Sequence, residues 1–396
     1  MGKQICSFCN KEMTWDNYGV EGNKAWICTD CLELYYQLLN IEEVETIDEN
    51  FIKFNEKEKI SPRFIFEKLN ECVISQEETK KVLAVALYQH YKRITCKELS
   101  DLDKPNILMI GPTGVGKTLL AKTMASILNL PLAICDATVY TQAGYVGEDV
   151  ENILLKLLQN ANYDLELAQR GIVFIDEFDK LARKSENPSI TRDVSGEGVQ
   201  NSLLKIIEGN IVNVPPQGGR KHPYQEYIKF DTSKVLFICA GSFEGIDSTK
   251  SDPIGFENQG INQNEFDTQK LKKFGIIPEI LGRLPVITRL KALTLEDLER
   301  ILTVPKHAVL KDYIRLFASD KINLIITDEV IKEIAEKAYY EGTGARALRK
   351  IIEEKMLDLM FELPYANESN QKINQIIIEK NEIKYNLCEK EELPSA

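Results

Sequence analysis

Residues 111–118 have the spacing of a loop that binds phosphate. They read Gly-Pro-Thr-Gly-Val-Gly-Lys-Thr and stand between an apolar run and a helical pattern, which is the context such a loop requires. Its glycines let successive backbone N–H groups turn toward phosphate oxygens, and the helix that follows adds partial positive charge. We expect Lys117 to reach the β/γ-phosphates and Thr118 to hold Mg²⁺. The residues assigned to the nucleotide here are Pro112, Thr113, Gly114, Val115, Gly116, Lys117, Thr118 and Leu119.

Two acidic residues, Asp176 and Glu177, stand at the end of the apolar run 172–175. A solvated loop also tolerates two acids, but carboxylates at a buried strand end are costly unless a metal or a partner neutralises them. With a phosphate loop upstream, we expect Asp176 to bind Mg²⁺ and Glu177 to polarise the attacking water. Together the motifs predict hydrolysis of a nucleoside triphosphate, and the Asp-Glu pair points to an ATPase of the AAA+ type.

Four cysteines near the N-terminus form two Cys-x2-Cys pairs, a spacing typical of a tetrahedral zinc site. They are Cys6, Cys9, Cys28 and Cys31, whereas the other five of the nine cysteines are scattered singly. This distribution indicates one metal site and buried thiols in a reducing compartment, and not a disulfide framework. Four thiolates leave no open position, so we expect Zn²⁺ to be structural and to supply the folding energy of a very small module.

Composition and charge exclude several classes of protein. The chain has 396 residues and a formal net charge of −12, which argues against a nucleic-acid binder that relies on broad phosphate neutralisation. No apolar run approaches the roughly 20 residues that cross a bilayer, and the cysteine motif begins too early to leave room for a signal peptide. We therefore expect a cytoplasmic protein that has neither a membrane nor a nucleic acid as its partner.

The motifs must be positioned by alternating strands and helices. Five apolar runs read as strands, and helical periodicity separates most of them, as at 149–160 and 199–208. This alternation predicts an α/β fold with a parallel sheet wrapped by helices. The cysteine module should end in a helical stretch at 32–41, and a further helix should begin at Ser61 and Pro62. The five runs are 106–110, 131–135, 171–175, 234–239 and 284–290.

Helical patterns dominate after about residue 290, at 295–317, 328–340 and 345–361, and 376–383 is a further strand candidate. The acidic stretch after the cysteine module reads as a solvated linker. We therefore predict four segments. They are a zinc-binding module at 1–41, a linker at 42–60, a large AAA+ ATPase domain at 61–286 and a small α-rich domain at 287–396.

Several segments resemble the ClpX family of AAA+ protein unfoldases. Besides the motifs above they are 143–152, 188–199, 219–223 and 277–285. The related HslU family shares the Gly-Tyr-Val-Gly loop but lacks the zinc module and carries a large insertion for which this chain has no room. The resemblance implies an AAA+ parallel αβα nucleotide-binding domain with a small α-rich domain, ATP as the nucleotide and a homohexameric ring. The implied partners are a ClpP-type peptidase, adaptors, and unfolded or tagged protein substrates.

The resemblance also gives roles to residues that the motifs leave open. Arg283 would be an arginine finger that reaches the neighbouring subunit, although sequence alone reads it as a helix cap. Arg346 would contact the nucleotide, and its place at a predicted helix start, where the dipole disfavours a cation, itself indicates an anionic partner. The remaining assignments are Val73 and Ile74 to the adenine pocket, Tyr145 and Val146 to a pore loop, Arg220, Lys221 and His222 to an entry loop, and Ile254, Gly255 and Phe256 to the loop that docks on the peptidase.

Other interpretations of the sequence remain. A nucleic-acid motor of the same superfamily would need basic pore loops, whereas acids follow the Gly-Tyr-Val-Gly loop here. A zinc-binding adaptor with a degenerate ATPase would not need an intact Lys117 or acid pair. Tyr145 by itself is equally an ordinary turn residue. Ser75 stands where the family usually has glycine, so we expect a non-glycine residue at positive φ and a slightly altered adenine pocket.

Overall fold

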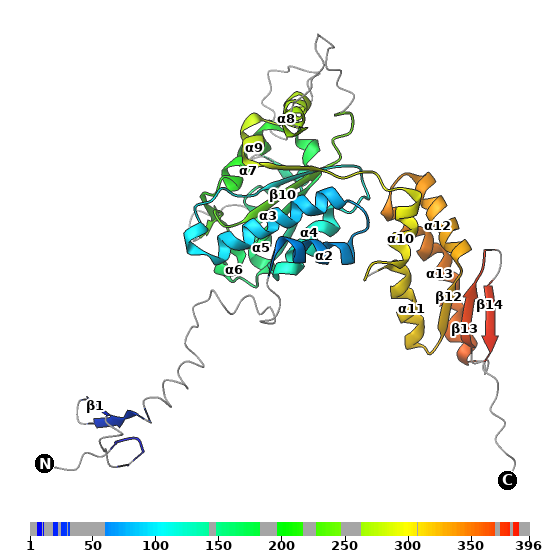
Figure 1. Cartoon of the computed structure of the whole chain (residues 1–396), viewed down its shortest axis with the longest axis horizontal. Helices are drawn as coiled ribbons and strands as arrows, with labels where there is room; N and C mark the ends of the chain where they lie inside the picture. The colour runs from blue at the N-terminus through cyan, green and yellow to red at the C-terminus, as the bar shows by residue number, and fades with distance from the viewer. Residues whose placement is uncertain are drawn as a thin grey trace. The chain divides into compact units, whose positions relative to one another are not determined.

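The computed structural model describes residues 6–9, 11, 19–22, 25–29, 31, 60–141, 148–182, 196–216, 227–246, 263–306, 308–368, 373–380 and 383–387. The chain divides into two compact units, Met1–Glu58 and Lys59–Ala396, which are drawn in Figure 1. In the first unit, β1 (Gly19–Gly22) pairs antiparallel with β2 (Ala25–Cys28). All the elements described below belong to the second unit.

A five-stranded parallel sheet forms the centre of the second unit, with the strand order β11-β3-β10-β7-β4. The five predicted runs supply its strands, as expected for strands that are buried on both faces and therefore read as continuous apolar segments. The strands are β3 (Ile107–Ile110), β4 (Leu132–Asp136), β7 (Ile172–Asp176), β10 (Leu236–Gly241) and β11 (Val286–Arg289).

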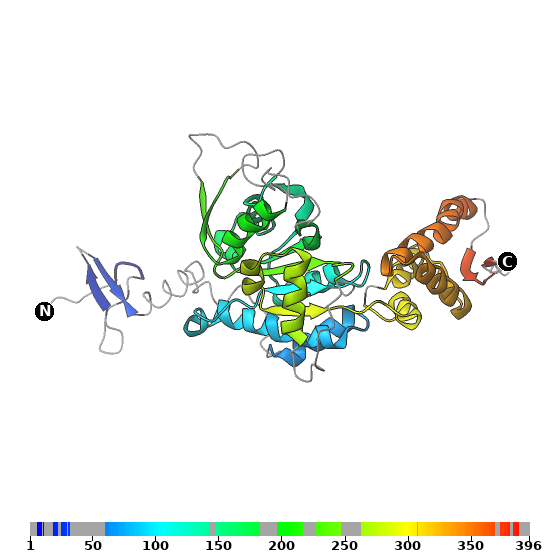
Figure 2. The same ribbon diagram turned by 90° about the horizontal axis from the view of Figure 1, so that it is seen from above.

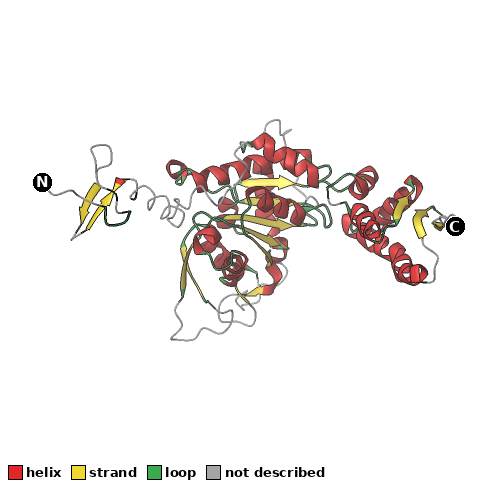
Figure 3. Ribbon diagram, turned by 90° about the horizontal axis from the view of Figure 1, so that it is seen from below, coloured by secondary structure: helices red, strands yellow, loops and turns green. Residues whose placement is uncertain are grey.

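Helices cover both faces of this sheet, as Figures 2 and 3 show. On one face, strand side chains such as Val173 pack in a single core with α5 (Asn152–Asn160) and α7 (Glu197–Ile207). Successive strand residues point to opposite faces, and on the other face α3 (Glu77–Thr95) contacts β11 and α4 (Lys117–Leu128) contacts β7. This arrangement confirms the predicted αβα fold.

Helix α2 (Pro62–Cys72) begins where the sequence predicts, because the Ser61 side chain accepts a hydrogen bond from the Phe64 N–H at 3.2 Å. The helical stretch predicted at 32–41 lies outside the described residues. Two short ladders flank segments that lie outside the described residues. They are β5 (Tyr140–Thr141) with β6 (Glu148–Asp149), and β8 (Ile211–Val214) with β9 (Ile228–Asp231). The remaining elements are α6 (Leu165–Gln169), α8 (Gln263–Phe274), α9 (Pro278–Arg283) and the 3-10 turns Lys97–Leu99, Ala137–Val139 and Phe178–Leu181.

The C-terminal part is mainly helical, as predicted, with three differences. The single helical pattern at 295–317 is two helices, because Pro305 cannot continue a helix interior. A strand at 323–326 was not predicted, and the single strand predicted at 376–383 is instead two strands, at 373–378 and 383–387. The elements are α10 (Leu295–Thr303), α11 (Val309–Ser319), α12 (Asp328–Glu341), α13 (Ala345–Glu368) and the sheet β12 (Asn323–Ile326), β13 (Ile373–Ile378) and β14 (Ile383–Leu387).

The predicted domain boundary after residue 286 falls inside β11. This strand stays in register with β3 as far as Arg289, so the α/β part extends through Arg289 and the connector to the helical part follows it. Among the described residues, no helix is long and apolar enough to cross a bilayer.

Candidate active site

The phosphate loop joins β3 to α4 at the carboxyl end of the sheet, the edge at which open α/β sheets bind ligands. Gly114 and Gly116 lie at φ values of +74° and +100°, which side chains rarely adopt. A Cβ added at Gly116 would meet only Val73, at 3.9 Å. The loop therefore has open space beside Gly116, next to the N–H groups that begin α4 and attract anions.

Lys117 is only 8% exposed, and its Nζ donates to the carbonyl oxygens of Gly111 at 2.6 Å and Pro112 at 2.8 Å. Burial lowers the pKa of this lysine, while the nearby carboxylates of Asp176 and Asp179 raise it. Its present partners are neutral carbonyls, and an ammonium group gains more from phosphate oxygens because both partners are then charged. Lys117 is thus placed to bind a phosphate at this loop.

The predicted acid pair ends β7, and β10 separates this strand from β3. The Thr118 hydroxyl donates to Asp176 Oδ2 at 3.3 Å, so a hydroxyl and a carboxylate converge as the hard oxygen ligands that Mg²⁺ prefers. Glu177 is exposed and lies at φ +53°, a conformation that costs free energy and recurs at active sites. These side chains fit a magnesium–nucleotide complex.

A cavity of about 740 Å³ joins these groups to an apolar region, and this volume is in the range of small-ligand sites. The phosphate loop, Asp176 and Glu177 supply the polar lining. Two apolar walls, which come from segments more than 200 residues apart in the chain, provide apolar surfaces of the kind that can accept a purine ring. They consist of Val73 and Ile74, as predicted for the adenine pocket, and of Leu293, Ile301, Pro305 and Val309.

The helical part also brings Arg346 and Arg349 to this cavity. Arg346 is the second residue of α13, at a helix start as predicted. The Ala345 N–H donates to the Gly114 carbonyl oxygen at 3.0 Å, and a Cβ at Gly114 would overlap the Thr343 carbonyl oxygen. The start of α13 therefore lies directly against the phosphate loop.

Sequence reasoning missed Asp179, Ser242 and Arg349 as cavity residues. The buried Asp179 carboxylate accepts hydrogen bonds from the Ser242 N–H at 3.2 Å and the Ser242 hydroxyl at 3.0 Å. The sequence contains only weak signals for two of these residues. Asp179 follows Asp176 by three positions, and Ser242 comes directly after β10, the strand between β3 and β7.

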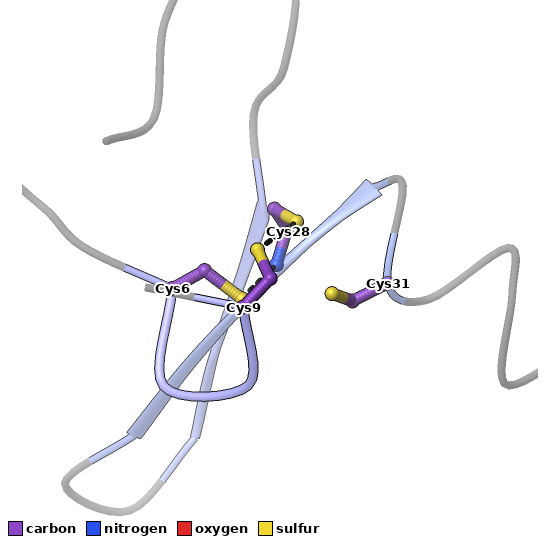
Figure 4. A group of neighbouring side chains, drawn as sticks. All are labelled: Cys6, Cys9, Cys28 and Cys31. Carbon is purple, nitrogen blue, oxygen red and sulfur yellow. Dashed lines mark hydrogen bonds between the residues drawn. The ribbon is translucent and has the colours of Figure 1, made fainter. Parts of the chain in front are cut away.

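The four predicted cysteines come together in the first unit, with their sulfur atoms all within 4.8 Å of one another. Figure 4 shows Cys6 and Cys9 at the two ends of a short loop, with Cys31 pointing toward them. The N–H groups of Phe8 and Cys28 donate to Cys6 Sγ at 3.5 and 3.3 Å, which favours its thiolate form. Four sulfur donors this close together fit a tetrahedral Zn²⁺ ion.

Comparison with known proteins shows the family to which the chain belongs. A family profile described as "AAA domain (Cdc48 subfamily)" matches residues 102–287, and one described as "C-terminal, D2-small domain, of ClpB protein" matches 293–378. A Porphyromonas gingivalis protein named "ATP-dependent Clp protease ATP-binding subunit ClpX" is 46% identical over 395 residues, covering 95% of this chain and 96% of that protein. Its Treponema denticola namesake is 49% identical over 384 residues, covering 92% and 91%. The chain belongs to the ClpX family.

Membership in the ClpX family confirms the resemblance that the motifs indicated. It makes the chain an ATPase of the AAA type and not itself a peptidase. The gap between the two matching profiles, residues 288–292, coincides with the end of β11 and the start of the connector. The cavity lined by Lys117 and Arg346 therefore lies between an AAA domain and a small C-terminal domain.

Arg283, the expected arginine finger, does not line this cavity. It ends α9, its side chain is 54% exposed, and it forms an ion pair with Glu208 at 3.3 Å. An exposed arginine remote from the chain's own cavity is compatible with a role toward a neighbouring copy, which stays a prediction. Eight other predicted residues lie outside the described part of the chain, and their roles stay predictions too. They are Tyr145, Val146, Arg220, Lys221, His222, Ile254, Gly255 and Phe256.

Ser75 has the positive φ that we expected, +59°, and Gln76 follows at +66°. A left-handed conformation costs an L-residue roughly 1–2 kcal/mol. We expect Ser75→Gly to relieve this cost. The free energy of unfolding should rise by only about 0.5–1 kcal/mol, because glycine also makes the unfolded chain more flexible, which offsets part of the gain. Thermal melting of the nucleotide-free protein would measure this change.

The matched control for this substitution is Ser202→Gly, because Ser202 lies inside α7. Glycine in a helix interior should destabilise the protein by about 1 kcal/mol. If both variants melted at a lower temperature than the parent, the left-handed conformation of Ser75 would not be a source of strain.

Proposed function

We propose that the chain forms a homohexameric ring that unfolds tagged proteins and threads them into a ClpP-type peptidase. One observation carries this proposal: the α/β domain and the small domain line the same nucleotide cavity, through Lys117 on one side and Arg346 on the other. Loss of the γ-phosphate would remove an anion that both cations attract. Each hydrolysis event would thereby change the forces that hold the two domains together, and this change can drive movement.

The residues of the site have distinct parts in hydrolysis. Lys117 would hold the β- and γ-phosphates, while Thr118 and Asp176 would hold Mg²⁺, which when bound neutralises phosphate charge. Glu177 would orient the attacking water and accept its proton, because it is the second carboxylate at the end of β7. Arg283 of a neighbouring copy would stabilise the charge that develops on the transferred phosphate.

The described residues support a mechanical role for the segment that carries Tyr145. The Lys156 Nζ on α5 donates to the Tyr140 hydroxyl and to Glu148 Oε2, both at 3.2 Å. Tyr140 and Glu148 lie in the strands on either side of segment 142–147. One lysine thus ties both ends of the segment to the ATPase core, so movement of the core would be transmitted to Tyr145 and Val146 in the pore.

The other predicted residues complete the proposal. Arg220, Lys221 and His222 would attract substrate tails at the ring entrance, and Ile254, Gly255 and Phe256 would dock on the peptidase. The zinc module would recruit adaptors and some substrates. All these roles rest on the family to which the chain belongs.

Replacement of Tyr145 by alanine tests the unfolding step. We expect Tyr145→Ala to keep most ATP hydrolysis but to unfold a tagged, stably folded fluorescent protein about tenfold more slowly, equivalent to roughly 1.4 kcal/mol on the barrier. The reason is that less side-chain surface grips the polypeptide at each stroke. Tyr145→Phe, which keeps the ring, is the matched control and should unfold the substrate at the parental rate.

ATP turnover and loss of fluorescence are measured side by side in the three proteins. Equal unfolding by parent and Tyr145→Ala would remove Tyr145 from the mechanism. A parent that unfolds nothing, but whose ATPase is stimulated by DNA or RNA, would instead establish the nucleic-acid motor.

A further inference from the structure

Gln76 makes an unusual pair of contacts with the backbone of the connector that follows β11. Its side-chain Nε2 donates to the Lys291 carbonyl oxygen at 2.7 Å, and the Lys291 N–H donates to its Oε1 at 2.9 Å. The residue is only 6% exposed. The donor and the acceptor of this buried side-chain amide are thus both satisfied by the backbone of one residue 215 positions away. The pair of hydrogen bonds resembles the one that two residues exchange in an antiparallel sheet.

Gln76 immediately precedes α3, and the first turn of that helix supports its contact with the connector. The Thr79 hydroxyl donates to the Arg289 carbonyl oxygen at 2.9 Å and accepts from the Thr288 hydroxyl at 3.0 Å. These bonds hold the last residues of β11, so Gln76 is the contact that continues beyond the strand into the connector. It fixes where the chain leaves the sheet for the small domain.

The two segments that Gln76 joins also form the apolar walls of the nucleotide cavity. Val73 and Ile74 lie three and two residues before Gln76 in the chain, and Leu293 lies two residues after Lys291. Ile301 on α10 continues the second wall. A change in the Gln76–Lys291 contact would therefore change the distance between the two walls.

We propose that Gln76 is a positioning residue for the nucleoside part of ATP. It sets the gap between the two apolar walls, so that binding of the base and placement of the connector depend on each other. Gln76 touches neither the phosphate loop nor the acid pair in any described contact. Its influence should therefore fall on the nucleoside and not on the phosphates.

Two further features give this contact particular weight. Two other links between the domains, from Ala345 N–H to Gly114 O and from Lys306 N–H to Glu71 O at 3.2 Å, are made by the backbone, and the ion pair of Lys291 with Glu78 at 3.5 Å joins two exposed side chains, which contributes little. Gln76 acts through its side chain. In addition, Ser75 and Gln76 both hold left-handed conformations, which persist only where the surroundings hold them in place. Loss of the Gln76 contact should let this loop, and Ile74 beside it, relax.

The test separates the nucleoside from the phosphates. It uses the full chain and measures the Kd of a fluorescent ATP analogue, together with competition by inorganic tripolyphosphate. In Gln76→Met, which keeps the length of the side chain but makes neither hydrogen bond, we expect the Kd for the ATP analogue to rise about tenfold, within the usual range of coupling between sites. The affinity for tripolyphosphate should be unchanged, because that ligand occupies only the phosphate loop.

The matched control is Gln200→Met. Gln200 is also buried and also pairs with backbone on two sides, donating to Leu181 O at 2.7 Å and accepting from Ile277 N–H at 2.9 Å. None of these three residues lines the cavity. This variant should lose thermal stability to a similar degree while keeping the parental Kd for the ATP analogue.

Two results would overturn the proposal: an unchanged Kd for the ATP analogue in Gln76→Met, or equal losses of affinity for the analogue and for tripolyphosphate. If Gln76→Met does not fold, Gln76→Gly decides, since glycine removes the contact and also relieves the left-handed backbone. The inference rests on ATP binding alone. Failure of the unfolding experiment would therefore leave this test valid, and failure of this test would leave the unfolding proposal intact.

Discussion

Glu177→Gln should bind ATP with the parental affinity but hydrolyse it about 10²–10⁴-fold more slowly. Glutamine has nearly the same shape as glutamate but cannot accept the proton of the attacking water. The pair of Thr118 and Asp176, which would hold Mg²⁺, is separate from this carboxylate, so nucleotide binding should survive. Release of inorganic phosphate and binding of a fluorescent ATP analogue measure the two effects.

Lys117→Ala should show the opposite behaviour and lose nucleotide binding itself. Lys122→Ala is its matched control, because Lys122 is an exposed lysine on the same helix and its removal should change neither binding nor hydrolysis. Parental hydrolysis by Glu177→Gln would show that the water-activating base is another residue, and the buried Asp179 would be examined next.

Removal of two zinc ligands should have the second large effect. The parent should contain about one zinc ion per chain, and the double variant Cys6→Ser/Cys9→Ser should contain none. Structural zinc contributes on the order of 10–16 kcal/mol to the folding of small modules, so the first unit should unfold. Metal analysis and protease resistance of the first unit measure these outcomes.

Cys96→Ser is the matched control, since Cys96 is a single half-buried cysteine in the second unit. It should keep the zinc content of the parent. A chain that starts near residue 60 should retain ATPase activity, because the two units are compact by themselves. Complete loss of ATPase activity in that chain would show that the units are not separable.

The sheet could be predicted because its strands are buried on both faces, which leaves short apolar runs such as 107–110 and 172–175 that stand out in the sequence. The start of α2 could be predicted for a different reason, the local chemistry of Ser61 and Pro62. By contrast, the apolar run in β12 is only three residues long, 324–326, and it follows the polar Asn323. Its strand conformation comes from pairing with β13.

The candidate site also contains residues that the sequence predicts and residues that it does not. The placement of Lys117, Asp176 and the four cysteines was predictable because their motifs have a fixed spacing along the chain. The second apolar wall could not be predicted. Leu293 and Val309 are apolar residues with no distinguishing motif around them, and only folding brings them to the same cavity as Val73. The same holds for Gln76, whose partner is 215 positions away. Local patterns contain no information about such distant pairs.

The order of the strands affects how the protein is made. β3, which leads into the phosphate loop, has β10 and β11 as its two neighbours, and both are translated more than a hundred residues later. At typical rates of synthesis the ribosome needs on the order of ten seconds to reach them. During that time both edges of β3 lack their partners, and such edges are prone to aggregation. The strand that leads into the phosphate loop is therefore a part of the newly made chain that needs protection from aggregation during synthesis.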